Sequence, residues 1–282
     1  MTYLDPRLDL VFKKLFSSEE NKDLLIDLIN AIVSEKDQVT DVEVLNPYNI
    51  EGWKDDKLSI LDIKVKDKNE KYYLIEMQIN NTGEYDKRAL YYWAKTYSSQ
   101  LQKGDKYSKL RKTIGIHILS FASIPKSEQY HSTFHLTEDN TGYIFSDDIE
   151  LHTIELEKFE KWFDKDEEAI NKMVTSLERW STFLTKWHDL AEPKLRDKFK
   201  DTPQAKALDV LEHISLDEKE REVYEAKFKW YCDEASMLHQ ARKEGQEEKA
   251  IEIAKNLLSQ GLDIETISSA TGLSIDEIDK LK

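Results

Sequence analysis

Apolar and polar positions alternate along two short runs joined by a polar turn, within residues 58–80. Strand side chains point alternately to opposite faces, so the odd-numbered positions of both runs, Leu61 to Val65 and Tyr73 to Ile79, form one apolar face. This face is expected to pack on a core. The even-numbered positions carry acidic, amide and lysine side chains on the other face. The pattern predicts a β-hairpin with polar chemistry on one side.

Two carboxylates meet on the polar face if a short loop closes the hairpin. With Lys66 and Tyr72 flanking the turn, Asp62 lies beside Glu76, with Cβ atoms within about 5.5 Å. Like charges at this distance repel each other unless a cation neutralises them. Carboxylate oxygens on paired strands suit Mg²⁺, which keeps several waters and leaves positions for phosphate oxygens. The alternative is a half-exposed hairpin whose polar face simply meets water.

The pattern around the hairpin predicts a mixed α/β region. Helical spacing of apolar residues predicts helices over 8–16 and 24–33, and alternation predicts a strand over 41–50. A helix is expected over 83–102. The run over 113–122 is apolar throughout, which is typical of a strand buried on both faces. Further strands are predicted over 130–136 and 149–156.

Beyond about residue 158 the pattern is helical, so we expect two regions, 1–158 with the sheet and 159–282 with helices only. The segments with helical patterns are 159–187, 204–213, 217–260 and two short helices between 264 and 281. Charged and apolar residues are interleaved in the long segment, as in a solvated helix or a partner-binding arm. The helical region is therefore expected to serve self-association or partner binding.

The last two helices resemble a helix-turn-helix in outline. Ser274 followed three residues later by Glu277 predicts a capping box at the start of the second helix. That helix carries Asp276, Glu277 and Asp279 and no arginine, so a DNA groove would repel it. A packing or self-association module is the favoured interpretation.

The formal net charge of −15 limits how the chain can hold nucleic acid. Proteins that bind nucleic acid are usually basic where they touch it, so contact has to rely on a local basic patch and on metal ions. The densest basic patch consists of Lys103, Lys106, Lys109, Arg111 and Lys112. A solvated loop is an equally good interpretation of this patch.

Several other classes of protein or site are not expected. No run of eighteen apolar residues occurs and the first residues mix acidic with basic side chains, so we expect neither a membrane span nor a secretory signal. Cys232 is the only cysteine, which excludes a disulfide framework and fits the cytoplasm. His131 and His135 fall in a strand-like run without a nearby acid, so we expect no metal there.

The order helix, three strands, helix, strand, with Asp on the second strand and Glu-x-Gln on the third, resembles the PD-(D/E)XK nuclease superfamily. More narrowly, the chain resembles the Rpn-type recombination-promoting nucleases, a transposase-like group. The matching segments are LDLVFKKLFS, LDIKV, YLIEMQI, KRALYYWAKTYSSQL, KGDKYSKL and IGIHIL, which together extend over about half the chain. The resemblance implies an α/β fold with a restriction-endonuclease-like mixed sheet flanked by helices, in the core order αβββαβ.

The resemblance also implies metal-dependent cleavage of DNA phosphodiester bonds. It implies that Asp62 and Glu76 hold Mg²⁺ or Mn²⁺, with the backbone carbonyl of Met77 as a further ligand. Gln78 occupies the position where most of the superfamily has lysine. The supporting residues that it implies are Asp9, which matches the acid of the first-helix motif, and Arg88 and Tyr92, which lie on the helix beside the site. Asp9 can equally be a first-turn acid favoured by the helix dipole, and Arg88 and Tyr92 can be structural.

Phosphodiester hydrolysis requires a metal ion and a group that positions the attacking water. Glutamine carries no charge, so Gln78 can only orient that water by a hydrogen bond. Lys64, two residues from Asp62 on the same strand face, is a candidate source of the missing positive charge. The leading hypothesis is a DNA endonuclease linked to recombination or mobile elements. The rivals are an inactive or weakly active nuclease-fold interaction protein, and a true transposase that also joins strands.

Overall fold

The computed structural model describes residues 3–46, 63–81, 83–164 and 173–281. In these residues the sheet has six strands, in the order β1-β2-β3-β4-β6-β5. They are β1 (Val42–Val44), β2 (Ile63–Asp67), β3 (Tyr72–Gln78), β4 (Thr113–Leu119), β5 (His131–Thr137) and β6 (Ile144–Glu155). β3, β4 and β6 pair in parallel, whereas the other neighbours are antiparallel. The sheet is mixed, as predicted.

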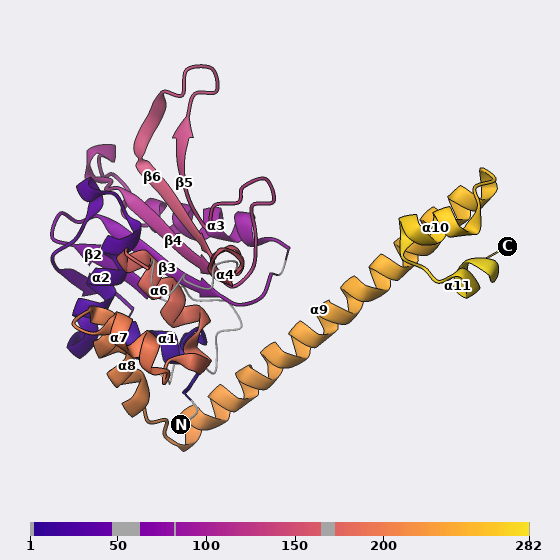
Figure 1. Ribbon diagram of the computed structural model, residues 1–282. Helices are drawn as coiled ribbons and strands as arrows, with labels where there is room; N and C mark the ends of the chain where they lie inside the picture. Colours follow the sequence, from indigo (N-terminus) through magenta and orange to yellow (C-terminus); the bar gives the residue numbers. More distant parts are fainter. Residues whose placement is uncertain (1–2, 47–62, 82, 165–172, 282) are drawn as a thin grey trace. The chain divides into compact units, whose positions relative to one another are not determined.

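The helices around the sheet give the predicted core order. α1 (Asp9–Phe16) and α2 (Lys22–Ile32) precede the first three strands, and α3 (Tyr85–Ser98) joins β3 to β4. A parallel pair needs such a crossover because its strands start at the same edge of the sheet. In Figure 1, α3 lies on one side of the sheet and α1 and α2 on the other. The two faces of the central strands are therefore covered by different helices.

The hairpin forms in the predicted register over its described part. Lys66 pairs with Tyr72 and Ile63 with Ile75. The Asp67 carboxylate accepts hydrogen bonds from the backbone N–H groups of Asn69 and Lys71, both at 2.8 Å, which fixes the turn. Asp62 lies outside the described residues, as do positions 47–50 of the first predicted strand.

Strand β4 is buried at every position, as its apolar sequence predicted. β3 is also buried on both faces, except at Tyr72, because α3 covers the face that carries Glu76 and Gln78. On that face the Trp93 indole N–H donates to the carbonyl of Thr113 at 2.8 Å. The polar face of β3 from Leu74 to Gln78 is thus an interior surface, whereas Lys64 and Lys66 on the β2 part of the same face are half-buried.

Several helices follow the sheet, and two of them, over residues 176–185 and 203–213, pack on α2. The helices after the sheet are α4 (Leu156–Asp164), α6 (Ser176–Thr185), α7 (Pro193–Phe199) and α8 (Pro203–His213), followed by the long α9 (Glu218–Ser259). The Trp180 ring lies 5.2 Å from that of Phe16 and donates a hydrogen bond to Asp27 at 2.7 Å. The last strand ends at Glu155, close to residue 158, beyond which the sequence pattern predicts helices only. The compact unit that contains the sheet nevertheless continues to Lys227.

Strand β6 starts five residues earlier than predicted and lengthens the β5–β6 hairpin. In Figure 1 this hairpin extends beyond the rest of the sheet. Its outer part exposes Phe134, Tyr143 and Phe145. In the parts of the chain that the structure describes, no helix has both the length and the apolar content needed to cross a membrane.

The second compact unit, Phe228–Lys282, ends in the predicted pair of short helices. These are α10 (Ile264–Thr271) and α11 (Ile275–Asp279), separated by Gly272 with φ of 74°. Ser274 and Glu277 form the predicted capping box. Ala254, Ile267 and Ile278 form the small core of this unit. The outline of a helix-turn-helix is therefore present.

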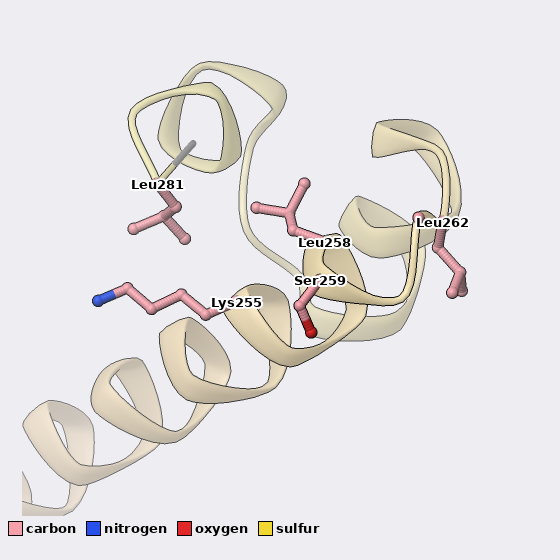
Figure 2. Close-up of a pocket in the computed structure, with 6 residues that line it drawn as sticks. Lys255, Leu258, Ser259, Leu262 and Leu281 are labelled. Atoms are coloured by element: carbon pink, nitrogen blue, oxygen red, sulfur yellow. The ribbon is translucent and has the colours of Figure 1, made fainter.

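An open depression of about 500 Å³ lies beside this core. Lys255, Leu258, Ser259, Leu262 and Leu281 line it (Figure 2), together with Gly261. Its described lining contains no carboxylate or imidazole, so it offers no groups for acid–base or metal chemistry.

Candidate metal and active site

The polar face of β3 meets α3 and β4 near the carboxyl ends of the two parallel strands. Glu76 and Gln78 project from this face of β3, and His117 of β4 pairs with Glu76 in the register. The Tyr85 ring of α3 contacts the His117 ring edge to face, with centroids 5.4 Å apart. Arg88 of α3 also contacts Glu76. The buried Glu76 carboxylate is thus surrounded by an amide, an imidazole, a phenol and a guanidinium.

Only one oxygen of Glu76 has a hydrogen bond. The residue is 4% exposed, and Oε1 accepts a hydrogen bond from Nη2 of Arg88 at 2.8 Å. Oε2 lies 3.3 Å from Nδ1 of His117 without a hydrogen bond between them, and the described residues offer Oε2 no other partner. A buried carboxylate is thus half satisfied by the protein.

Burial alone would raise the pKa of Glu76, but the nearby His117 and Arg88 outweigh it. The pKa of Glu76 therefore lies below its ordinary value, and the carboxylate is charged at neutral pH. A charged, buried oxygen that accepts no hydrogen bond is suited to bind a cation.

Arg88 connects the two polar residues of β3. Its guanidinium donates to Oε1 of Gln78 as well as to Glu76, and its Nε is buried without a partner among the described residues. The Gln78 amide donates to the carbonyl of Asn80 at 3.1 Å. The structure therefore brings together Glu76, Gln78 and Arg88, three of the predicted site residues, and it places a fixed positive charge beside the glutamine.

Lys64 lies elsewhere along the hairpin. It pairs with Leu74, and its ammonium lies 5.3 Å from the centre of the Tyr72 ring. Burial lowers the pKa of Lys64. Tyr72 precedes Gln78 by six residues, which is about 20 Å along an extended strand. The positive charge that contacts Gln78 belongs to Arg88 and not to Lys64.

The remaining predicted residues are not gathered at Glu76 by any contact in the described structure. Asp9 begins α1, and its carboxylate pairs with Lys227 of α9 at 2.5 Å. Tyr92 lies one turn beyond Arg88 on α3, and its ring packs against that of Tyr91. The side chain of Met77 is buried on the opposite face of β3, so only its backbone carbonyl remains a candidate ligand.

His117 is the site residue that sequence reasoning missed. It lies within the apolar run of β4, where it interrupts a row of isoleucines. The parallel register that places it opposite Glu76 depends on how α3 crosses the sheet. The only signal in the sequence was a histidine in a strand otherwise free of ionisable groups.

A second buried polar cluster lies on the opposite face of the sheet. The Lys112 ammonium contacts Glu150 at 2.8 Å, Asp37 at 2.9 Å and Asp147 at 3.3 Å. Burial alone would lower the pKa of Lys112, but the contacts with Glu150 and Asp37 outweigh the effect of burial. The pKa of Lys112 is therefore raised. Lys112 was predicted as part of an exposed basic patch. That prediction is wrong for this residue, because its charge neutralises buried acids of the same domain.

Histidines extend this cluster towards the edge of the sheet. His152 contacts Glu150 at 2.8 Å and His131 at 3.0 Å. The expectation that His135 has no nearby acid is wrong, since Nδ1 of His135 lies 3.8 Å from Glu150 of β6. Atoms of His135, Asp147 and Glu150 lie within 4.8 Å of one another, as metal ligands can. The Lys112 ammonium already contacts two of these three residues, Asp147 and Glu150, and neutralises them as a metal ion would.

The mixed sheet, the αβββαβ order and the Glu-x-Gln face under α3 define the fold of a PD-(D/E)XK nuclease. Residues 6–241 match the model of the PD-(D/E)XK nuclease family transposase. The chain belongs to this family. Residues 247–282 match a second model, the C-terminal HTH domain of the Rpn/YhgA-like nuclease family. No curated protein and no solved structure matches the chain.

Removing the charge of Lys112 should destabilise the protein strongly. In Lys112→Met, the buried acids Asp37 and Glu150 lose a cationic partner, which typically costs about 3–5 kcal/mol. Lys36→Met is the control, because Lys36 pairs with the exposed Asp147 and should cost about 1 kcal/mol or less. Urea unfolding followed by circular dichroism measures both. Equal losses would contradict a central role for Lys112.

Stability should also depend on the protonation of His131. Burial, together with the neighbouring His152, lowers the pKa of His131 to about 4 from an ordinary value of 6.5. As the pH falls, His131 is therefore protonated in the unfolded chain before it is protonated in the folded protein. The free energy of unfolding should fall as the pH drops from about 6.5 to 4. Burial alone would raise the pKa of Glu150, but its contacts with His152 and Lys112 lower it to about 2, so its contribution is lost separately, below about 4.5. Urea unfolding at several pH values should give a flatter profile for His131→Gln.

Proposed function

We propose that the protein is a Mg²⁺- or Mn²⁺-dependent DNA endonuclease that hydrolyses phosphodiester bonds, in DNA recombination or in mobile elements. The observation that supports this most directly is the Glu76 carboxylate, charged and buried in a nuclease-family domain, with one oxygen that accepts no hydrogen bond from the described residues. A purely structural carboxylate in an interior is expected to have both oxygens satisfied.

The residues present fit a hard divalent cation. Glu76 offers Oε2, and the proposed set adds the carboxylate of Asp62 and the backbone carbonyl of Met77. These are oxygen ligands, which Mg²⁺ and Mn²⁺ accept. When bound, the cation supplies Lewis-acid polarisation of the phosphoryl oxygen and lowers the pKa of a water. Glu76 is held in place for this by Arg88.

Arg88 is proposed to provide the positive charge that lysine provides in most of the superfamily. Its guanidinium already contacts Gln78 and Glu76 from α3. Arginine has five N–H donors, so it can hold Gln78 and still donate to a phosphate oxygen. The buried Nε has no partner among the described residues and is one such donor. Gln78 then needs only to orient the attacking water.

DNA binding is proposed to be weak and sensitive to salt. Lys103, Lys106 and Lys109 are exposed in the connection between α3 and β4. This connection leads to Thr113, at the opposite end of the strands from Gln78, so it suits a contact along the duplex away from the cleaved bond. With a net charge of −15, few other surfaces attract phosphate. We propose that DNA is the partner, that the C-terminal helices mediate self-association, and that the protein acts in the cytoplasm.

Removing the charge of Glu76 should abolish cleavage. Wild-type protein incubated with supercoiled plasmid and Mg²⁺ or Mn²⁺ should give nicked or linear products that chelator prevents. In Glu76→Gln or Asp62→Asn the rate should fall about 100-fold or more, because the cation loses a charged ligand. Glu84→Gln is the control, since Glu84 is exposed on the surface just before α3.

The same experiment separates the rival functions. An interaction protein that only keeps the nuclease fold should show no cleavage and no Glu76-dependent binding of Mn²⁺ in calorimetry. Joined DNA products in addition to cut ones would instead indicate a transposase. Cleavage by Glu76→Gln at the wild-type rate would show that Glu76 is not the site.

Arg88 should affect the rate of cleavage more than the binding of substrate. If its charge assists the reaction, Arg88→Ala should lower kcat about tenfold or more, and Arg88→Lys should recover part of the loss because it keeps the charge. Arg221→Ala, at an exposed position on α9, should leave kcat unchanged. Steady-state cleavage at saturating substrate measures kcat, and thermal melting shows whether each variant is folded. An unchanged kcat in folded Arg88→Ala protein would contradict this role.

A further inference from the structure

His117 is a buried polar side chain without a hydrogen bond. It is 2% exposed, and neither Nδ1 nor Nε2 has a hydrogen-bond partner in the residues that the structure describes. Leaving a buried polar group unpaired destabilises the folded state, because its hydrogen bonds to water are lost and not replaced. A buried imidazole without a hydrogen bond therefore requires an explanation. A bound ligand that interacts with one of its nitrogens is such an explanation.

The separation of His117 from Glu76 matches that of two ligands of one ion. Nδ1 of His117 and Oε2 of Glu76 are 3.3 Å apart, and both lack a hydrogen bond within the described part of the chain. Two atoms that are each about 2.1 Å from one cation, at angles of about 90–109°, lie about 3.0–3.4 Å apart. The two atoms therefore have the spacing of two ligands of one ion and make no hydrogen bond with each other.

The surrounding residues hold the imidazole ring in this orientation. Tyr85 packs against it edge to face. On the other side Gly115 leaves room for the ring, since a Cβ at position 115 would lie 2.9 Å from Nε2. Nε2 therefore faces the backbone of β4 while Nδ1 faces Glu76. A ring fixed in this way needs little rearrangement to coordinate a cation through Nδ1.

We propose that His117 is a nitrogen ligand of the cation that Glu76 binds, and that it makes the site select Mn²⁺ over Mg²⁺. This inference rests on the proposed function of Glu76. Carboxylate, carbonyl and water oxygens suit both Mg²⁺ and Mn²⁺, but Mn²⁺, as a first-row transition-metal ion, binds an imidazole nitrogen more tightly than Mg²⁺ does. One nitrogen ligand added to an oxygen set therefore changes which ion binds more tightly.

Calorimetric titration of the full chain with Mn²⁺ and with Mg²⁺ tests the preference. In His117→Gln the Kd for Mn²⁺ should rise at least about tenfold and the Kd for Mg²⁺ by about threefold or less. Glutamine retains a polar group beside Glu76, so a role limited to hydrogen bonding would leave the ratio of the two Kd values unchanged. That result would overturn the proposal. His239→Gln, at an exposed position on α9, is the control for loss of a histidine.

Pulsed electron paramagnetic resonance of the Mn²⁺-bound protein gives a readout that does not depend on activity. The wild type should show a ¹⁴N coupling from a coordinated imidazole, which becomes a ¹⁵N coupling after labelling with ¹⁵N-histidine, and Glu76→Gln should lose it. Absence of the coupling in wild-type protein whose Mn²⁺ binding depends on Glu76 would refute His117 as a ligand and leave the proposed function intact. Absence of Glu76-dependent Mn²⁺ binding would refute both. The labelled wild type gives this answer even if His117→Gln fails to fold.

Discussion

The structure depends on burying charge on both faces of the same sheet. The Glu76 carboxylate is enclosed under α3, and on the opposite face Asp37 and Glu150 are enclosed around Lys112. A buried charge is tolerated only with a compensating partner. Each face therefore needs a cation from a flanking segment, Arg88 from α3 and Lys112 from the residue before β4. The position of α3 and the start of β4 are both tied to this compensation.

The two faces differ in how completely the protein satisfies its buried acids. The Glu150 carboxylate has a lysine and a histidine within hydrogen-bond distance, so its charge is fully compensated from within the domain. Glu76 accepts a hydrogen bond on one oxygen only in the described structure. The first arrangement stabilises a fold, and the second leaves a coordination position for something else. This contrast distinguishes a structural cluster from a candidate site although both contain acids, histidines and a cation.

Local patterns in the sequence predicted much of the fold. Alternation gave the β2–β3 hairpin and its register, and the run over residues 113–122 gave the buried strand β4. The capping box at Ser274 also followed from two residues three apart. The predictions that failed concern residues whose environment depends on contacts between distant segments. Lys112 was predicted to be on the surface because its acids come from elsewhere in the chain, and His117 was missed because its partner depends on a parallel pairing across α3. For the same reason, the contact of Arg88 with Gln78 could not be derived from spacing.

The alternation of β3 has a consequence for how the protein can change over evolutionary time. Neighbouring positions on this strand face different environments, since Ile75 and Met77 pack in the apolar layer while Glu76 and Gln78 face α3. A substitution at an odd-numbered position is constrained by volume, and one at an even-numbered position by charge and ligand chemistry. Because these constraints are nearly independent, the residue at position 78 can change between lysine and glutamine without repacking the core one residue away.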